Sequence, residues 1–183
     1  MREFPKSLGL AGSLLIAHPN LLDPNFRRTV LYLSASDPKE GSFGFVLNRP
    51  SEKTVGDFLP EQDLGILSDV AVFLGGPVSA DQLTFASFTW HDEAVECRTH
   101  LVIEEAREMA DADFSTVRAF VGYAGWSQGQ LEAELAQKAW LTQKPDLDLL
   151  DPEKCAAMWT TIMREQGPWF RLLAAAPDDP SKN

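Results

Sequence analysis

Apolar residues in the first two thirds of the chain gather in short runs, and glycine, proline or polar residues separate these runs. Runs of roughly four to eight apolar residues that end at turn residues are typical of buried strands. A polar loop at residues 34–41 joins two such runs and favours an antiparallel pair. The pattern predicts strands at residues 12–17, 29–33, 42–47, 70–74, 83–88 and 117–121.

Helical spacing becomes clear toward the C-terminus. Asp151 followed by Pro152 is a strong helix start, with aspartate as the N-cap and proline at the first helical position. The apolar positions that follow lie on one helical face and predict a core-facing stripe of Cys155, Met158, Trp159 and Ile162. The secondary structure of residues 95–102 is ambiguous from the sequence. Further predicted elements are short helices at 54–58, 104–112 and 169–176, and an extended segment at 139–141.

The stretch at residues 121–134 combines the end of a predicted strand, a glycine-rich turn and the start of a helix. Ser127, with Gln130 three residues later, has the pattern of a capping box. Leu131 and Leu135 fall on one face of the helix that follows. We predict that this junction, at residues 122–130, takes part in a functional surface.

Strands concentrate early and helices late, without strict alternation. This order predicts an α+β fold with a mainly antiparallel or mixed sheet. The 183 residues, 44% of them hydrophobic and 23% charged, are sufficient for one core. We predict a single domain at residues 1–176 and a flexible acidic tail at residues 177–183.

The formal net charge of −11 is unevenly distributed. Residues 1–60 carry a net charge of +1, whereas residues 61–183 carry −12. An acidic surface repels phosphate backbones, whose binding relies on lysine and arginine. The sequence also shows no helix-turn-helix pattern. Direct nucleic-acid binding is therefore disfavoured.

The N-terminal apolar run has the outline of a signal peptide, but Gly9 and Gly12 interrupt it and no small-residue cleavage pattern follows. No run reaches the roughly 18 apolar residues of a membrane span. Cys97 and Cys155 lie far apart and outside any C-x-x-C pair, which is typical of buried free thiols in a reducing compartment. We predict a cytoplasmic protein that does not act at a membrane.

Catalytic chemistry has little support in the sequence. The three histidines lack the spacing of metal ligands, and neither cysteine lies in a nucleophile motif. We predict no bound metal and no cofactor, although carboxylates that converge in space leave metal-dependent catalysis as a minor alternative. His18 and nearby Asp23 could form a general base. A packed or surface histidine is the alternative.

A basic cluster lies in the near-neutral N-terminal third and consists of Arg27, Arg28 and Arg49. If the turns at residues 23–28 and 48–50 come together, they form a cationic patch. Such a patch could bind an acidic ligand, a protein or, with Phe26 stacking on bases, single-stranded nucleic acid. The alternative is an internal role, in which Arg28 pairs with a carboxylate and Asn48 caps a turn.

Two glycine-rich segments, Gly75-Gly76 and residues 122–129, could present backbone N–H groups to a phosphate or carboxylate. Tight turns and close backbone packing explain the same glycines without a ligand. Tyr123, Trp126 and Trp140 could line a pocket or a partner groove. Core packing is the alternative for these aromatic residues.

Several motifs together resemble the AlgH/YqgE family of bacterial proteins. They are GSLLIA at 12–17, DPNF at 23–26, RTV at 28–30, GFVLNRP at 44–50, GGPV at 75–78 and GYAGW at 122–126. The resemblance continues through GQLE at 129–132, Glu134 and Ala139-Trp140, and covers about residues 10 to 142. It implies an α+β fold in which a branched sheet, with a small closed β-barrel, is surrounded by helices.

The resemblance implies no established biochemical activity, although one branch of the family is treated as a transcriptional regulator of exopolysaccharide synthesis. Many members carry a Glu-His pair just after the second strand. Residues 34–40 of this chain contain no histidine. Chemistry assigned to that pair in relatives therefore does not transfer to this chain.

We thus predict a non-enzymatic binding or regulatory protein whose partner is another protein or a small ligand. The alternative is a small-ligand-binding protein or hydrolase-type enzyme, in which the same turns line a polar cleft. The candidate surface consists of His18, Asp23, Phe26, Arg28, Asn48, Arg49, Gly75, Gly76, Tyr123, Trp126 and Gln130.

Overall fold

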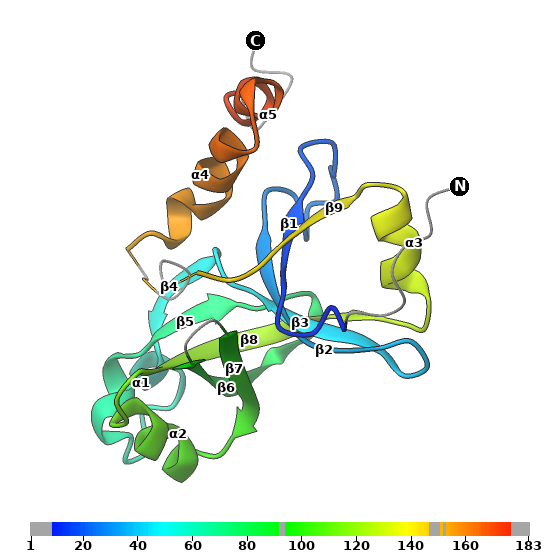
Figure 1. Cartoon of the computed structure of the whole chain (residues 1–183). Coiled ribbons are helices and arrows are strands. Elements are labelled where there is room, and N and C mark those ends of the chain that lie inside the picture. Colours follow the sequence, from blue (N-terminus) through cyan, green and yellow to red (C-terminus); the bar gives the residue numbers. More distant parts are fainter. Residues whose placement is uncertain (1–8, 92–93, 147–150, 152, 177–183) are drawn as a thin grey trace.

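The computed structural model of the protein describes residues 9–91, 94–146, 151 and 153–176. Its first three strands form an antiparallel meander (Figure 1): β1 (Leu14–Ala17), β2 (Val30–Asp37) and β3 (Gly41–Val46). All four residues of β1 are buried, so the first apolar run is a core strand. The predicted antiparallel pairing of the second and third strands is confirmed.

The sheet branches at β8 (Ser115–Trp126), the strand that runs through the middle of the molecule. Residues 124–126 of β8 pair antiparallel with β3. Residues 119–121 pair parallel with β5 (Ala71–Leu74), and residues 115–121 pair antiparallel with β6 (Val78–His91). One strand therefore belongs to both halves of the sheet.

The remaining strands extend this sheet at its margins. They are β4 (Pro50–Thr54) beside β5, β7 (Ala94–Leu101) beside β6, and β9 (Trp140–Gln143) beside β1. Figure 1 shows the sheet curling into a half-barrel. The predicted α+β class, with a mixed and branched sheet, is confirmed.

Helices cover opposite ends of the sheet (Figure 1). At one end lie α1 (Val55–Phe58), a 3-10 turn (Gly65–Asp69) and α2 (Ile103–Ala110). Away from these, α3 (Gln130–Ala136) lies on one side of β1 and β9. A second 3-10 turn (Cys155–Ala157), α4 (Met158–Glu165) and α5 (Pro168–Ala174) lie on the other side. No helix in the described part of the chain is both long enough and apolar enough to span a bilayer.

The apolar stripe predicted for the C-terminal helix is buried in the core. Trp159 anchors it, because its indole N–H donates to the carbonyl of Ala17 at 2.8 Å. The helix start is displaced, however. The Asp151 carboxylate accepts the Glu153 N–H at 3.0 Å and so caps a turn, whereas α4 begins only at Met158. Residue 152 and the predicted tail at 177–183 lie outside the described residues.

Strands extend into two segments that were predicted to be loops or turns. The loop predicted at residues 34–41 is half strand, since β2 continues to Asp37 and pairs with the start of β3. The glycine-rich turn predicted from residue 122 is also wrong, because β8 runs on to Trp126. In both places a neighbouring strand supplies the backbone hydrogen bonds, and this tertiary pairing overrides the local turn preference.

The glycines permit a close backbone approach between the end of β5 and β8. Gly122 has a φ of +71°, and a Cβ atom there would lie 2.3 Å from the carbonyl oxygen of Gly76. A Cβ atom on Gly75 would lie 2.3 Å from the carbonyl oxygen of Gly122. Any side chain would separate the strands at this crossing, so the packing interpretation of these glycines is the one the geometry supports.

Candidate functional site

The turn at residues 23–28 is built by Asp23, as the sequence predicts. Its carbonyl accepts the N–H groups of Phe26 at 3.0 Å and Arg27 at 2.7 Å. Its carboxylate accepts the Asn25 N–H at 2.8 Å. The aspartate thereby holds the backbone in a compact bend that positions the two following arginines.

The second turn, at residues 48–50, packs directly against the first. The Asn48 side chain accepts the Val30 N–H at 2.8 Å and donates to the Arg28 carbonyl at 2.9 Å. The Arg49 guanidinium donates to the main-chain carbonyls of Asn25 at 2.6 Å, Arg27 at 3.0 Å and Pro24 at 3.1 Å. The condition set in the sequence analysis, that the two turns come together, is therefore fulfilled, and Arg49 joins them.

A polar hollow of about 400 Å³ lies over this junction. We call it the arginine pocket, and it is lined by Leu22, Pro24, Arg27, Arg28, Asn48, Arg49 and Ala156. Its three arginines are all partly exposed. The arginine pocket thus gathers three arginines on a chain with a net charge of −11.

The C-terminal helices complete the arginine pocket. The Arg28 guanidinium carbon lies 5.1 Å from the ring centroid of Trp159 on α4. Arg28 also donates to the carbonyl of Ala176, just beyond α5. A cation over an indole face is favourable, and the stacking holds the guanidinium against the pocket wall. Arg28 has a φ of 56°, so the turn is strained here.

Electrostatics in the arginine pocket disfavour additional positive charge. Partial burial lowers the pKa of Arg49, and the neighbouring charge of Arg27 lowers that pKa further. Asp23 acts in the opposite direction, with a smaller effect. The Arg49 hydrogen-bond partners are neutral carbonyls, which satisfy its N–H groups but leave its charge in place.

Aromatic rings support the turn from below. Phe26 stacks on Trp126 with ring centroids 6.1 Å apart and meets Trp140 edge-on at 5.6 Å. Both indole N–H groups donate to one carboxylate oxygen of Glu134, at 2.9 Å and 2.8 Å. Trp126 is only 5% exposed, so the core role left open for it by the sequence is the observed one.

Gln130 belongs to the same network. Its side-chain N–H donates to Glu134 at 3.1 Å, and its side-chain oxygen accepts the Ser127 N–H at 3.1 Å. This is the predicted return arm of the capping box. The other arm differs, because Gly129 is the N-cap and the Ser127 hydroxyl bonds to the Gln130 side chain.

The remaining candidate residues of the predicted surface lie outside the arginine pocket. Tyr123 packs on Phe43 at 5.0 Å and lines a separate open hollow of about 480 Å³. Gly75 and Gly76 lie at the crossing of β5 and β8. His18 contacts Phe170 of α5 edge-on at 5.6 Å, and its ring Nδ1 accepts the Asn20 N–H at 3.2 Å. Burial, with a contribution from Lys138, lowers the His18 pKa.

The side chains of His18, Asp23 and Asn48 therefore each form hydrogen bonds to a different stretch of backbone, rather than to one another. In the described part of the chain, no three His, Cys, Asp or Glu side chains gather in a metal-binding group. What the structure offers is a cationic hollow beside two turns that side-chain hydrogen bonds to main-chain carbonyls hold together. Such a hollow can hold an anionic group by charge and by guanidinium hydrogen bonds.

The chain as a whole has relatives among known proteins. A model of the AlgH-like family matches residues 14–171. The chain belongs to the AlgH-like family. A UPF0301 protein of Thermobifida fusca is 34% identical over 191 residues, which cover 96% of each chain. A UPF0301 protein of Streptomyces coelicolor is 39% identical over 189 residues, with 95% of each chain covered.

Solved structures agree on the fold of this AlgH-like protein. The solution structure of AlgH from Pseudomonas aeruginosa has a TM-score of 0.64 and 28% identity, and the match covers 97% of this chain and 98% of that one. A crystal structure from Corynebacterium diphtheriae has a TM-score of 0.69 at 21% identity, with 94% and 95% covered. The resemblance in the sequence motifs is confirmed.

Sequence reasoning missed the contribution of the C-terminal helices to the arginine pocket. The sequence predicts Trp159 as a core residue, and it is 2% exposed, yet its ring also supports Arg28. Ala156 forms part of the pocket wall. The motifs of the AlgH-like resemblance end near residue 142, so nothing in them points to a partner for the arginines beyond that residue.

Proposed function

We propose that this AlgH-like protein works by binding, and that the arginine pocket holds an anionic group of a small ligand or a partner protein. One observation carries the proposal. Arg49 directs its N–H groups to three main-chain carbonyls, with the charge of Arg27 beside it. Carbonyl oxygens orient the guanidinium without neutralising it.

An anion entering the arginine pocket would relieve this repulsion between like charges. Guanidinium groups bind carboxylate and phosphate through paired N–H donors, and the contacts are stronger where water is partly excluded. The two hydrogen-bonded turns and the Trp159 ring hold the donors before a ligand arrives. Such preorganisation reduces the ordering cost of binding. A regulatory role would follow if an anionic partner occupied the pocket.

Binding is proposed rather than catalysis because the candidate catalytic groups serve local structure. His18 accepts an N–H from Asn20, and Asp23 caps its own turn. A hydrolase-type reaction would need such groups to converge on one substrate position. We also propose that the protein acts in the cytoplasm, where its free thiols Cys97 and Cys155 would remain reduced.

Pyrophosphate and a hexaglutamate peptide are suitable probes, titrated in a calorimeter with the full chain. We expect Arg27→Gln and Arg28→Gln each to weaken binding about tenfold, which corresponds to one lost charged hydrogen bond. Arg164→Gln removes the same charge from an exposed position on α4 and serves as the control. Equal affinity in all three variants would refute the proposal.

A further inference from the structure

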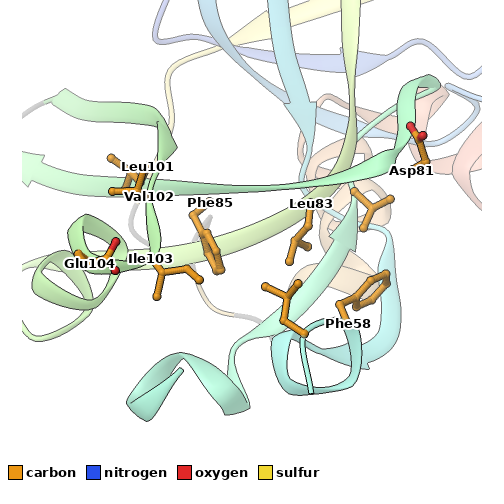
Figure 2. A pocket seen from close by; sticks show the side chains of 10 residues that line it. Phe58, Asp81, Leu83, Phe85, Leu101, Val102, Ile103 and Glu104 are labelled. Atoms are coloured by element: carbon orange, nitrogen blue, oxygen red, sulfur yellow. The ribbon is translucent and has the colours of Figure 1, made fainter. Parts of the chain in front are cut away.

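A second hollow, of about 580 Å³, lies at the opposite end of the sheet from the arginine pocket. It is bounded by α1, by β6 and by the connection between β7 and α2, and its wall is mainly apolar. Figure 2 shows Leu83, Phe85 and Ile103 pointing into one space, with Phe58 beside them on α1. We call this hollow the acidic groove, because its rim and the surrounding chain are rich in carboxylates.

Apolar side chains remain uncovered in the acidic groove. Its floor is buried, with Phe85 5% exposed and Leu101 7% exposed. Its rim is open, with Val102 57% exposed and Phe58 37% exposed. Single exposed apolar residues are ordinary, but several that face one hollow mark a surface that contacts another molecule. The volume lies within the range of about 300–1,000 Å³ that is typical of ligand sites.

Carboxylates stand at the ends of this apolar row. Asp81 and Glu104 both line the groove and lie on opposite sides of it in Figure 2. The surrounding sequence, residues 57–113, contains 13 acidic and 2 basic residues. Arg98 forms an ion pair with Glu105 at 3.8 Å, whereas Arg107 donates to the neutral Asp63 carbonyl and keeps its charge, so this segment stays strongly acidic.

Charge complementarity selects the occupant. A second copy of this chain has a net charge of −11 and, despite its arginine pocket, would be repelled as a whole, and an anionic ligand would also be repelled. A partner segment with apolar residues on one face and lysine or arginine beside them would match both features. Its apolar side chains would leave water, and its cations would meet the rim carboxylates.

We propose that the acidic groove docks a cationic, amphipathic segment of a partner protein. The apolar face of that segment fills the space between Phe58, Leu83 and Ile103. Its basic side chains lie beside Asp81 and Glu104. This inference is independent of the arginine pocket, which attracts the opposite charge at the other end of the molecule.

A synthetic peptide of about 14 residues, with leucine at helical a and d spacing and lysine elsewhere, is the probe. Its fluorescein-labelled form is titrated with the full chain and followed by anisotropy. We expect saturable binding, and binding about tenfold weaker for a scrambled peptide of the same composition. A leucine–glutamate version should not bind. Failure of the leucine–lysine peptide to bind would overturn the proposal.

Variants locate the site. Val102 is the N-cap of α2, a position that favours asparagine, so Val102→Asn removes an apolar contact without harming the helix. We expect about tenfold weaker peptide binding, the scale of one lost buried valine. Leu172→Asn on α5, where Leu172 is 66% exposed, is the matched control and should bind normally.

Charge reversal separates the groove from the general acidity of the chain. Asp81→Lys should weaken peptide binding several-fold more than Glu132→Lys, an exposed position on α3 with the same change in net charge. Equal losses would mean unspecific attraction and would overturn the proposal. So would self-association that Val102→Asn abolishes, because a second copy would then be the occupant. If the leucine–glutamate peptide bound as tightly as the leucine–lysine peptide, the proposal would also be overturned, because the groove would then recognise apolar side chains without regard to charge.

Discussion

The arginine pocket and the acidic groove are two hollows on one branched sheet, and they are constructed differently. Main-chain turns held by hydrogen bonds to Asp23, Asn48 and Arg49 form the arginine pocket. Apolar side chains from helices and strands form the acidic groove, with charge only at its rim. The first depends on polar geometry and the second on hydrophobic area. Damage to one should therefore leave the other intact.

The strongest expected effect concerns the aromatic support of the arginine pocket. Trp126→Ala empties a core site that contacts Phe26, so it should lower the free energy of unfolding by about 3–5 kcal/mol. Denaturant titration measures this change. Trp169→Ala, where the side chain is 65% exposed, is the control and should stay within about 0.5 kcal/mol. A near-normal stability of Trp126→Ala would mean that the support is dispensable.

A smaller effect is expected at the joint between the two turns. Asn48→Ala leaves the Val30 N–H and the Arg28 carbonyl without their partner, which should cost about 1–3 kcal/mol. Because the Arg28 backbone loosens, pyrophosphate affinity should fall as well. Binding of the leucine–lysine peptide to the acidic groove should not change. Equal loss at both sites would show that they are not separable.

The smallest expected effect is a pH dependence of folding stability that arises from His18. Burial lowers the pKa of His18 below 6.5, so the unfolded chain binds a proton more readily than the folded chain. The stability that neutral His18 contributes is complete above pH 6.5 and is lost as pH falls toward the lower folded-state pKa. His18→Asn should flatten the stability profile between about pH 7.5 and 5.5.

Melting curves of the natural protein and of His18→Asn, recorded across this pH interval, measure the difference in stability. The contributions of the other titrating groups cancel in that difference. Because His18 is only partly buried, the difference should be small. A variant whose stability falls more steeply with decreasing pH than that of the natural protein would contradict a lowered His18 pKa.

Local patterns predicted those parts of the molecule in which one segment determines its own conformation. The strand β1 and the buried stripe before and within α4 follow from apolar spacing, and the short helix α1 ends before Pro60 as predicted. The meeting of the two turns was a conditional expectation, and the hydrogen bonds of Arg49 fulfil that condition. That the two turns form a binding surface stays a prediction, and so does the ligand.

The same reasoning failed where distant pairing decides the outcome. Gly122 is typical of a turn, yet β3 and β6 pair with the residues on both sides of it and keep β8 extended. The interpretation of residues 95–102 stayed ambiguous, although burial alternates from residue to residue along β7, a strand at the margin of the sheet. The acidic groove was missed because its side chains come from separate elements.

Side chains on a strand alternate between two faces, so β8 carries a constraint that reaches both ends of the molecule. Deleting one residue near Gly122 would move the side chains of the following β8 residues to the opposite face of the sheet. Trp126 would then leave its aromatic cluster, while Val121, which precedes the deletion, would keep its position. Insertions and deletions in this family should thus occur in the loops and be absent from β8, because the length of this strand fixes the side-chain register at both surfaces.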